Sequence, residues 1–318
     1  MLARIAENIF WLGRYLERVE DMARLVSVNT SLKLDLPRGI APTWDGLVTI
    51  IGAEGAYRER YEDDFDEQRV VRFLLSDKQA GTSVLASLTY ARSNARSMRD
   101  LLPREAFEHL NTLFHYASDE LNVGLSKRGR FTYLSEIIEG CQTFDGILAG
   151  TMQHDQAYDF YHLGRHLERA DMTTRIIDVR SQSLIPDDLD ELRPFDVVQW
   201  MSILRALSAH QMYRRVIQGP VGRADALRFL FQSDAFPRSV RFSMARLDSH
   251  LEAIGGGDEA RHQIARLLRM VQEVDPVNVG REALSALIDE IQVALADVQQ
   301  CLASTYFNPI EESLPADN

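Results

Sequence analysis

The sequence predicts an all-α fold of about a dozen helices, arranged as two homologous helical-bundle halves. Apolar residues recur at helical spacing along extended stretches, and no run of residues alternates convincingly in the pattern of a β-strand. Prolines and glycines mark the ends of these stretches. Long helices bury their apolar stripes against one another, so the pattern favours a helical bundle.

Turn residues set the expected helix boundaries. The first helix is expected to end before Pro37 and Pro42, and another to span about residues 81–102. Pro103 can begin the next helix, because the first helical residue needs no N–H donor. The three glycines at 255–257 are expected to end a later helix. Further breaks are expected at Pro186, Pro194, Pro237 and Pro276.

One charged helix is written twice. Residues 8–26, NIFWLGRYLERVEDMARLV, and residues 159–177, DFYHLGRHLERADMTTRII, share L-G-R-x-L-E-R at one register, 151 positions apart. The halves are therefore expected to be residues 1–151 and 152–318, packed about a pseudo-twofold axis as one compact unit. Further matches, 156 positions apart, pair Trp44 with Trp200, Tyr57 with Tyr213 and Ser83 with Ser239.

The repeated helix carries an apolar stripe on one side and a charged stripe on the other. The core-facing stripe is Ile9, Leu12, Leu16, Val19, Ala23 and Val26 in the first copy, and Phe160, Leu163, Leu167, Ala170, Thr174 and Ile177 in the second. The opposite stripe is Trp11, Arg14, Tyr15 and Arg18 in the first copy, and His162, Arg165, His166 and Arg169 in the second, flanked by Glu17 and Glu168. Apolar groups lie nearly all round the first copy, which indicates a buried helix whose charges must be paired or face a polar cavity.

Two interpretations of the charged stripe stay open. In the structural one, Glu17 pairs with Arg14 or with an arginine of the other copy, and the motif locks two helices together. In the functional one, the arginines line a pocket for a carboxylate or phosphate, because a guanidinium can bind such anions through two parallel hydrogen bonds. The glutamates would then hold the arginine side chains in place. The residues of this candidate pocket are Arg14, Glu17, Arg18, Arg165, Glu168 and Arg169, with His162 or His166 available to move a proton.

Other arginines are candidates for the same cleft. Arg92, Arg96 and Arg99 lie one turn apart on the helix expected at about 81–102. Arg238 and Arg241 occupy a comparable helix in the second half. These side chains either join the repeated helices in one cationic cleft or form surface pairs with acidic residues.

The spacing of His162 and His166, i and i+4, raises the question of a metal site. Arg165 and Arg169 share that face and would repel a cation, and the first copy carries aromatic residues at the two histidine positions. A di-iron bundle would need two Glu-x-x-His motifs and two further glutamates, and the sequence has one such motif. Neither a metal nor a cofactor is therefore expected.

Composition limits the class of partner and the compartment. The chain has 318 residues, with 35 basic and 47 acidic side chains and a net charge of −12. Nucleic-acid binding depends on neutralising phosphates, so an acidic chain with only three lysines is not expected to bind nucleic acid. No apolar run is long enough to cross a membrane. Cys141 and Cys301 form no disulfide framework, and a cytoplasmic protein is expected.

The chain resembles the Alpha-E family, a bacterial group named for an α-helical domain with a glutamate-arginine motif. The family's motif falls on Glu17-Arg18 and Glu168-Arg169. The histidines at 162 and 166 depart from the bulkier or aromatic residues usual there. The resemblance covers the whole chain and rests on LARIAENIFWLGRYLERVEDMARL at the start, YARSNARSMRD at 90–100, HLGRHLERADMTTRIID at 162–178 and FPRSVRFSMARLDSHL at 236–251.

The resemblance implies a role in a ligase system. Alpha-E genes lie beside, or are fused to, genes for ATP-grasp-like and transglutaminase-like proteins, which suggests a system that makes or removes a small peptide conjugate. The chain itself has no P-loop, dinucleotide-binding or nucleophile-elbow motif. We therefore expect a partner of an ATP-grasp-type ligase. One alternative is an enzyme acting on amide or ester bonds, with Glu168 or His166 as general base. Another is a purely structural scaffold.

Overall fold

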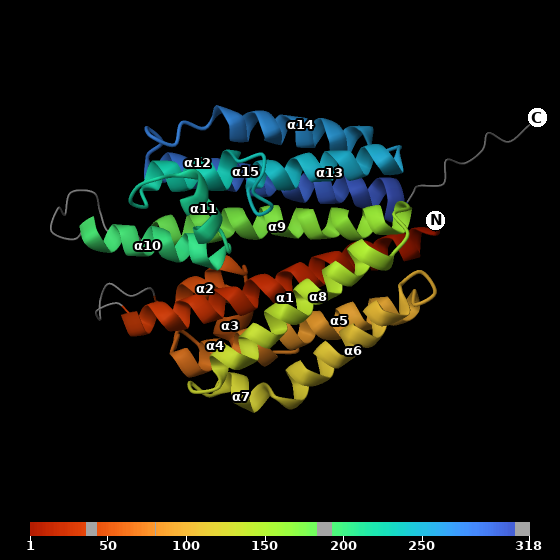
Figure 1. Cartoon of the computed structure of the whole chain (residues 1–318), viewed down its shortest axis with the longest axis horizontal. Helices are drawn as coiled ribbons and strands as arrows, with labels where there is room; N and C mark the ends of the chain where they lie inside the picture. The colour runs from red at the N-terminus through yellow and green to blue at the C-terminus, as the bar shows by residue number, and fades with distance from the viewer. Residues whose placement is uncertain (36–42, 80, 183–192, 309–318) are drawn as a thin grey trace, which may run out of the picture.

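Two long helices, α1 (Ala3–Asp35) and α9 (Gln156–Gln182), pack side by side at the centre of the computed structural model (Figure 1). The structure describes residues 1–35, 43–79, 81–182 and 193–308, and within these ranges it contains fifteen α-helices and no strand. The all-α prediction is therefore confirmed. Both central helices run in the same direction in Figure 1, from the end near the N-terminus toward the opposite end of the molecule.

Each central helix is covered by its own set of helices. In the first half of the chain, α1 packs against α5 and α8, and α6 covers both of these. In the second half, α9 packs against α13 and α15, and α14 covers both. The helices in these two sets are α5 (Val84–Ser97), α6 (Arg104–Asp119), α8 (Arg130–Thr151), α13 (Val240–Ile254), α14 (Asp258–Glu273) and α15 (Arg281–Leu302).

Shorter elements complete the fold. They are α2 (Asp45–Ile50), α3 (Glu54–Tyr61), α4 (Glu67–Ser76), α7 (Leu121–Leu125), α10 (Arg193–Ala206), α11 (His210–Val216), α12 (Arg223–Gln232) and a π-helical turn, η2 (Ala303–Phe307). Several have only five to eight residues, which is too short for an apolar period to be seen in the sequence. For this reason the expected dozen helices is an undercount.

The core of the molecule contains the apolar stripes of both central helices. All twelve predicted core positions of α1 and α9 are buried. The phenyl ring of Phe10 and the indole ring of Trp11 are packed as well, so α1 is enclosed on most of its sides. Any charged side chain on the same stretch of α1 therefore lies in an environment with little water, as the sequence indicated.

Local signals explain most of the helix ends. α13 ends at Ile254, and Gly255 follows with a φ of 79°, a conformation that suits glycine. Pro237 and Pro276 lie between helices, as predicted. Pro103 is the N-cap of α6 and not its first residue, and α5 ends at Ser97, before the end expected at about residue 102.

Pro194 lies in the first turn of α10, where a proline is tolerated, so it begins a helix and does not end one. The breaks expected at Pro37, Pro42 and Pro186 lie outside the described residues. In the part of the chain that the structure describes, no helix combines the length and the apolar character needed to cross a membrane.

Candidate functional site

The two copies of the charged motif meet where α1 and α9 pack. Gly13 and Gly164 allow the backbones to approach closely: a Cβ added to Gly164 would lie 1.9 Å from Phe10 O, and one added to Gly13 would lie 2.1 Å from Tyr161 O. The two glycines occupy the same position of the L-G-R-x-L-E-R motif. No other residue type fits this approach, so the glycines determine how close the charged residues one turn further on come to each other.

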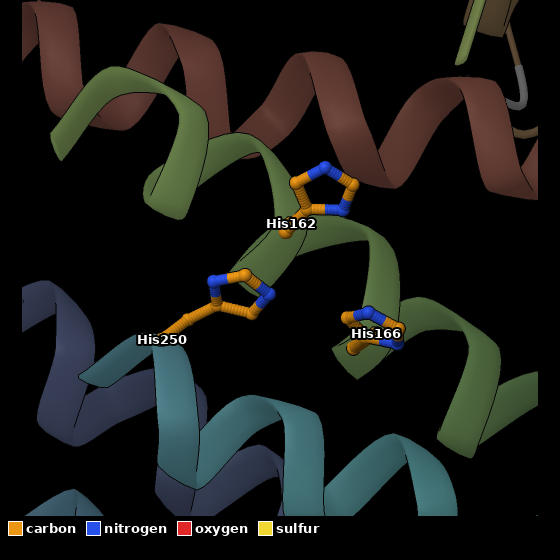
Figure 2. A group of neighbouring side chains, drawn as sticks. All are labelled: His162, His166 and His250. Carbon is orange, nitrogen blue, oxygen red and sulfur yellow. The ribbon is translucent and has the colours of Figure 1, made fainter. Parts of the chain in front are cut away.

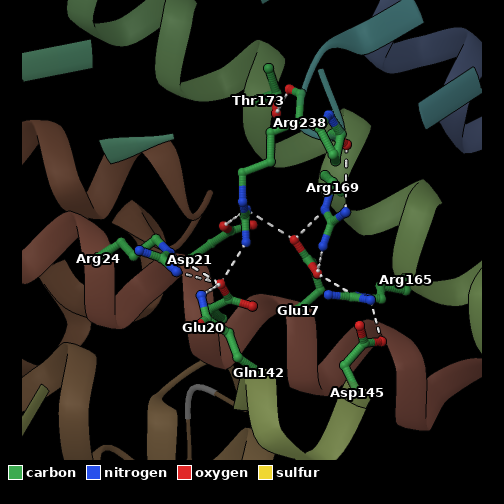
Figure 3. A network of polar contacts seen from close by, with 11 residues as sticks. Glu17, Glu20, Asp21, Arg24, Gln142, Asp145, Arg165, Arg169, Thr173 and Arg238 are labelled. Carbon is green, nitrogen blue, oxygen red and sulfur yellow. Dashed lines mark hydrogen bonds and ion pairs between the residues drawn. The ribbon is translucent and has the colours of Figure 1, made fainter. Parts of the chain in front are cut away.

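Each motif glutamate binds the arginines of the other copy. The Glu17 carboxylate accepts hydrogen bonds from Arg165 Nε at 2.9 Å and from Arg169 Nε and Nη2, both at 2.6 Å (Figure 3). The Glu168 carboxylate accepts them from the Nε atoms of Arg14 and Arg18, both at 2.6 Å. Both glutamates are fully buried. The arrangement is reciprocal, as two copies of one motif related by a twofold operation would make it.

Arg238 adds a third guanidinium on the Glu17 side. It lies just before α13, and its side chain extends to α1, where Nη1 is 3.0 Å from Glu17 Oε1 and Nη2 is 2.8 Å from Glu20 Oε1 (Figure 3). Arg238 also pairs with Asp21. Glu20 Oε1 lies 2.7 Å from Arg24 Nη2 as well. The Glu17 side is therefore a larger network, which joins α1, α9 and the segment before α13.

The Glu168 side is smaller and is flanked by aromatic rings. The Arg14 guanidinium lies 5.2 Å from the centroid of the Trp11 ring, and that of Arg18 lies 5.9 Å from the ring of Tyr15. Arg14 also donates to the side-chain carbonyl of Gln299 on α15. The first copy therefore uses its aromatic residues to cover the guanidiniums that bind Glu168.

The charges of the network fix the protonation of its acids. Burial alone would raise the pKa of Glu17, but Arg169, Arg238 and Arg165 outweigh burial and hold this pKa well below its usual range. In the same way, Arg18 and Arg14 lower the pKa of Glu168 to about 2 against the effect of burial. Both motif glutamates are therefore carboxylates at neutral pH and hold their protons too weakly to serve as general bases.

Asp21 is the exception among the buried acids. Burial raises the pKa of Asp21 to about 7, and the attraction of Arg238 is opposed by repulsion from Glu17 and Glu20. Its Oδ2 atom is buried and has no hydrogen-bond partner. The network therefore contains one carboxyl group that changes charge close to neutral pH.

A small hollow opens beside the Glu168 side. It has a volume of about 120 Å³ between α9 and α15, and its polar lining comes from Arg14, Asp171, Arg175, Gln292 and Gln299. Arg175 is bound to Asp171 at 2.9 Å, one turn away on α9. The hollow is large enough for one carboxylate or phosphate group.

Comparison with known proteins shows which family the chain is part of. Residues 1–307 match the profile of Alpha-E, described as a predicted alpha-helical domain with a conserved ER motif. The chain belongs to the Alpha-E family. Relatives include uncharacterized proteins of Mycobacterium bovis and Mycobacterium tuberculosis, each 22% identical over 95% of this chain. The chain spans 36% of the length of these relatives. No solved structure matches it.

In this Alpha-E chain, both Glu-Arg pairs are used for contacts between helices. Arg18 binds Glu168 and Arg169 binds Glu17, so each half of the motif serves the other copy. The guanidinium Nε atoms are occupied by carboxylates of the chain itself. The sequence left open whether these arginines lock two helices together or line an anion pocket. Their Nε atoms bind glutamates across the α1–α9 contact, so for these atoms the structure shows the helix-locking arrangement.

The remaining predicted residues divide into two groups. Arg92 donates to Asn111 Oδ1 on α6 at 2.5 Å and lies over the ring of Phe114, and Arg96 is exposed. These two arginines therefore face away from the α1–α9 contact and do not extend the cleft as proposed from the sequence. His162 and His166 face α13, where His250 meets them (Figure 2).

The sequence did not indicate that His250 lies beside His162 and His166. It also did not indicate that Arg238 pairs with three acidic residues of α1. His250 lies on the buried stripe of α13, at helical spacing from Ser243 and Leu247. A histidine on an otherwise apolar or small-residue stripe was the available signal. The position of Arg238 depends on how α13 packs against the centre, which spacing along the chain does not reveal.

Proposed function

We propose that this chain is a helical auxiliary module of an ATP-grasp-type amide or peptide ligase system, built from two copies of one unit, residues 1–151 and 152–318. In this role it would hold a companion enzyme and an anionic group of the substrate, while the companion uses ATP. The observation that carries the proposal is that the mycobacterial relatives contain this unit as 36% of a longer chain. Fusion to further domains is typical of modules that act together with a second activity.

The helix bounds support the doubled architecture. α12 begins and ends 156 positions after α4 (223 against 67, 232 against 76). α15 begins and ends 151 positions after α8 (281 against 130, 302 against 151). If the helices of the two halves were unrelated, the first and last residues of each pair would not be expected to lie the same number of positions apart.

Local contacts repeat in the same way. Ser83 and Ser239 are the N-caps of α5 and α13; each hydroxyl accepts from the amide three residues later at 3.1 Å and donates to the carbonyl six residues earlier at 2.5 Å. Tyr57 and Tyr213 each make an edge-to-face contact with a phenylalanine sixteen residues further on. Such agreement between side chains supports a common origin of the two halves.

An apolar groove gives the companion a place to bind. The groove has a volume of about 350 Å³ and is lined by residues of α11, α12 and the segment before α13, including Met212, Phe229 and Pro237. Val216 and Met212 on its rim are 69% and 44% exposed. Large apolar side chains gathered at one hollow are typical of a protein contact surface.

The hollow beside Arg14 is the place we assign to the anionic group. Arg14 and Arg175 present positive charge to it, and Gln292 and Gln299 offer further hydrogen bonds. A carboxylate entering there would have to compete with Asp171 for Arg175. Binding at this hollow is therefore expected to be weak for the isolated chain and stronger when the companion contributes groups of its own.

The test measures assembly and turnover together. The chain is mixed with the ATP-grasp-type ligase encoded nearest to it, and complex formation is followed by light scattering after size-exclusion chromatography, with ATP hydrolysis and amide formation as the second readout. We expect a stable complex that Val216→Glu weakens at least tenfold. Val293→Glu is the matched control, because Val293 is 63% exposed on α15 outside the groove. If the two proteins neither associate nor affect each other's activity, the proposal is wrong. A transglutaminase-like neighbour is tested in the same way.

A second pair of variants tests the anion site. Arg175→Gln is expected to raise the KM of the assembled system for its anionic substrate while leaving assembly intact. Arg24→Gln is its control, because Arg24 occupies the equivalent position of the first copy and makes the same one-turn pair, with Glu20. If Arg175→Gln and Arg24→Gln change the KM equally, the hollow is not the binding site of the anionic group.

The structure bears differently on the two alternative functions, a stand-alone enzyme and a purely structural scaffold. An enzyme that uses Glu168 as its general base loses support, because two guanidiniums hold this buried glutamate ionised, with a pKa of about 2. A purely structural scaffold remains the competing proposal, since the Glu-Arg motif is fully used within the chain. The assembly experiment separates the two, because a scaffold without a companion shows no effect on ligase turnover.

A further inference from the structure

Three histidines from two helices meet where α13 packs against α9. His162 and His166 lie one turn apart on α9, and His250 approaches them from α13 (Figure 2). The ring centroid of His250 is 5.2 Å from that of His162 and 5.9 Å from that of His166. One nitrogen of each ring lies within 4.8 Å of one nitrogen of each of the other two.

Each of the three rings has one buried nitrogen without a hydrogen-bond partner. Nε2 of His162, Nδ1 of His166 and Nε2 of His250 are all buried and unpaired. A buried polar atom without a partner costs roughly 1–3 kcal/mol, and buried polar groups in folded proteins are nearly always satisfied. Three such rings, each with one nitrogen within 4.8 Å of the others, therefore suit a ligand that accepts lone pairs from imidazoles.

Asp159 prepares His250 to act as such a donor. The Asp159 carboxylate lies 2.8 Å from His250 Nδ1, so Nδ1 carries the hydrogen and donates it to Asp159. The lone pair of His250 is then on Nε2, the atom that faces the other two rings. A carboxylate behind a histidine is the usual outer contact of metal-binding imidazoles, because it fixes both the tautomer and the direction of the ring.

The three imidazoles are neutral, as metal ligands must be. Burial, with Arg165 next, lowers the pKa of His162 to about 2. Burial, with Arg169 next, holds the pKa of His166 well below its ordinary value, and burial also lowers that of His250 against the effect of Asp159. None of the rings has to lose a proton at neutral pH before it binds a cation.

Arg165 and Arg169 share this face of α9 and would repel a cation if their charges were not balanced. Both guanidiniums are turned toward Glu17, and Arg165 also pairs with Asp145, so carboxylates of the chain already balance their charge. The repulsion predicted from the sequence is thereby reduced. Only His162 and His166 are close together in the sequence, whereas the fold brings His250 to them as a third histidine.

The equivalent positions of the first half differ together. Where the second half has His162, His166 and His250, the first has Trp11, Tyr15 and Asn94, at the offsets of 151 and 156 positions that relate the two halves. Trp11 and Tyr15 stack on each other, with ring centroids 5.5 Å apart. All three histidines are thus particular to one half, which a shared ligand explains and a packing role does not require.

We propose that His162, His166 and His250 bind one divalent transition-metal ion of the zinc class. Three histidines with a fourth position left for water or a carboxylate form a known zinc donor set, with Zn–N distances of about 2.0–2.1 Å. Tetrahedral geometry then places the nitrogens about 3.3 Å apart. The rings must close in from a spacing of up to 4.8 Å, which small rotations of the side chains provide. The bound ion would link α9 to α13.

The full chain, stripped with a chelator and dialysed, tests the proposal with Zn²⁺ and Co²⁺ as probes. We expect one zinc ion per chain by elemental analysis. We also expect the intense visible bands of tetrahedral Co²⁺, and a melting temperature that rises with added zinc. These measurements use the natural chain and need no variant. If the chain binds no stoichiometric zinc and shows no cobalt bands, the proposal is wrong.

Variants then assign the ligands. His250→Gln and His166→Gln are expected to lose the cobalt bands and at least 100-fold in zinc affinity, and Asp159→Asn to lose about 10–100-fold because it only orients His250. His262→Gln is the control, because His262 is exposed on α14. Circular dichroism checks that each variant is folded. Equal zinc binding by His262→Gln and His250→Gln would show binding elsewhere and overturn the assignment.

Discussion

Replacing Gly164 by alanine tests whether α1 and α9 pack as closely as their backbones imply. The added Cβ would lie 1.9 Å from Phe10 O, whereas a carbon and a carbonyl oxygen in contact are about 3.3 Å apart or more. The two helices must therefore separate locally by roughly 1.4 Å. Gly13→Ala makes the reciprocal clash, at 2.1 Å from Tyr161 O.

Two effects of opposite sign determine the change in the free energy of unfolding. Alanine favours a helix over glycine by about 1 kcal/mol, while overpacking costs about 1–3 kcal/mol and sometimes more. Separation also stretches the guanidinium–carboxylate contacts between the helices, which are 2.6–2.9 Å long. We expect each substitution to destabilise the fold by about 2–4 kcal/mol. The double variant should lose less than the sum, because the first substitution already separates the helices.

Urea unfolding followed by circular dichroism measures the change. Gly146→Ala is the matched control: Gly146 is exposed within α8, and an added Cβ there meets no atom within 4 Å. This control should gain up to about 1 kcal/mol from helix propensity alone. If Gly164→Ala and Gly13→Ala also gain stability, the close approach of α1 and α9 and the lock built on it are refuted.

Further expectations concern the charges. Glu17→Gln should cost about 3–5 kcal/mol, more than Glu168→Gln, because three guanidiniums meet Glu17 and two meet Glu168; urea midpoints give the order. The pKa of Glu168 falls from about 4.3 in an unfolded chain to about 2 when folded. Its contribution is therefore present above pH ~4.3 and lost as the pH falls toward 2, so Glu168→Gln should flatten this part of the acid-unfolding curve. The pKa of Asp21 is raised to about 7, so the folded state binds its proton more tightly and stability declines as the pH rises from ~4 through 7. Asp21→Asn should remove this decline and be more stable than the natural chain at pH 8 by at least about 1 kcal/mol. Arg92→Ala should cost about 1 kcal/mol, because its partner Asn111 is neutral.

Two results would contradict the reasoning on charges. Equal urea midpoints for Glu17→Gln and the natural chain would mean that the buried carboxylate is not needed to hold its arginines. A natural chain whose stability does not change between pH 5 and pH 8 would mean that Asp21 titrates as an exposed residue does, and not as a buried one.

The sequence predicted what depends on local pattern. The core stripes of α1 and α9, the end of α13 at its glycines and the need to pair buried charges all follow from spacing and residue type, and the structure agrees. It left open which arginine binds which glutamate, because that choice depends on the close approach at Gly13 and Gly164. A glycine within a helix can serve several purposes, and spacing alone does not distinguish them.

The third histidine shows the same limit for the candidate metal site. His162 and His166 are visible as a pair because one helix carries both, whereas His250 lies 84 positions after His166 in the printed sequence. Only the packing of α13 on α9 brings it to them. Conversely, Arg92 and Arg96 looked like members of the cleft because their spacing suited it, but α5 turns Arg92 toward α6.

The two halves of the chain share the Glu-Arg contacts but differ in the residues around them. The reciprocal Glu-Arg contacts use both copies equally, so neither copy of the motif can change without loss to the other. Residues outside this lock are not bound by the same restriction. Arg14 of the first half lies beside the Trp11 ring and lines a small hollow together with residues of α9 and α15. The second half has three histidines at the positions that correspond to Trp11, Tyr15 and Asn94. The two proposed sites, the hollow at Arg14 and the three histidines, would then lie at a fixed separation. If the metal and the anion both bind, variants of Glu17 should weaken both together, whereas variants of His250 or Arg175 should each weaken one.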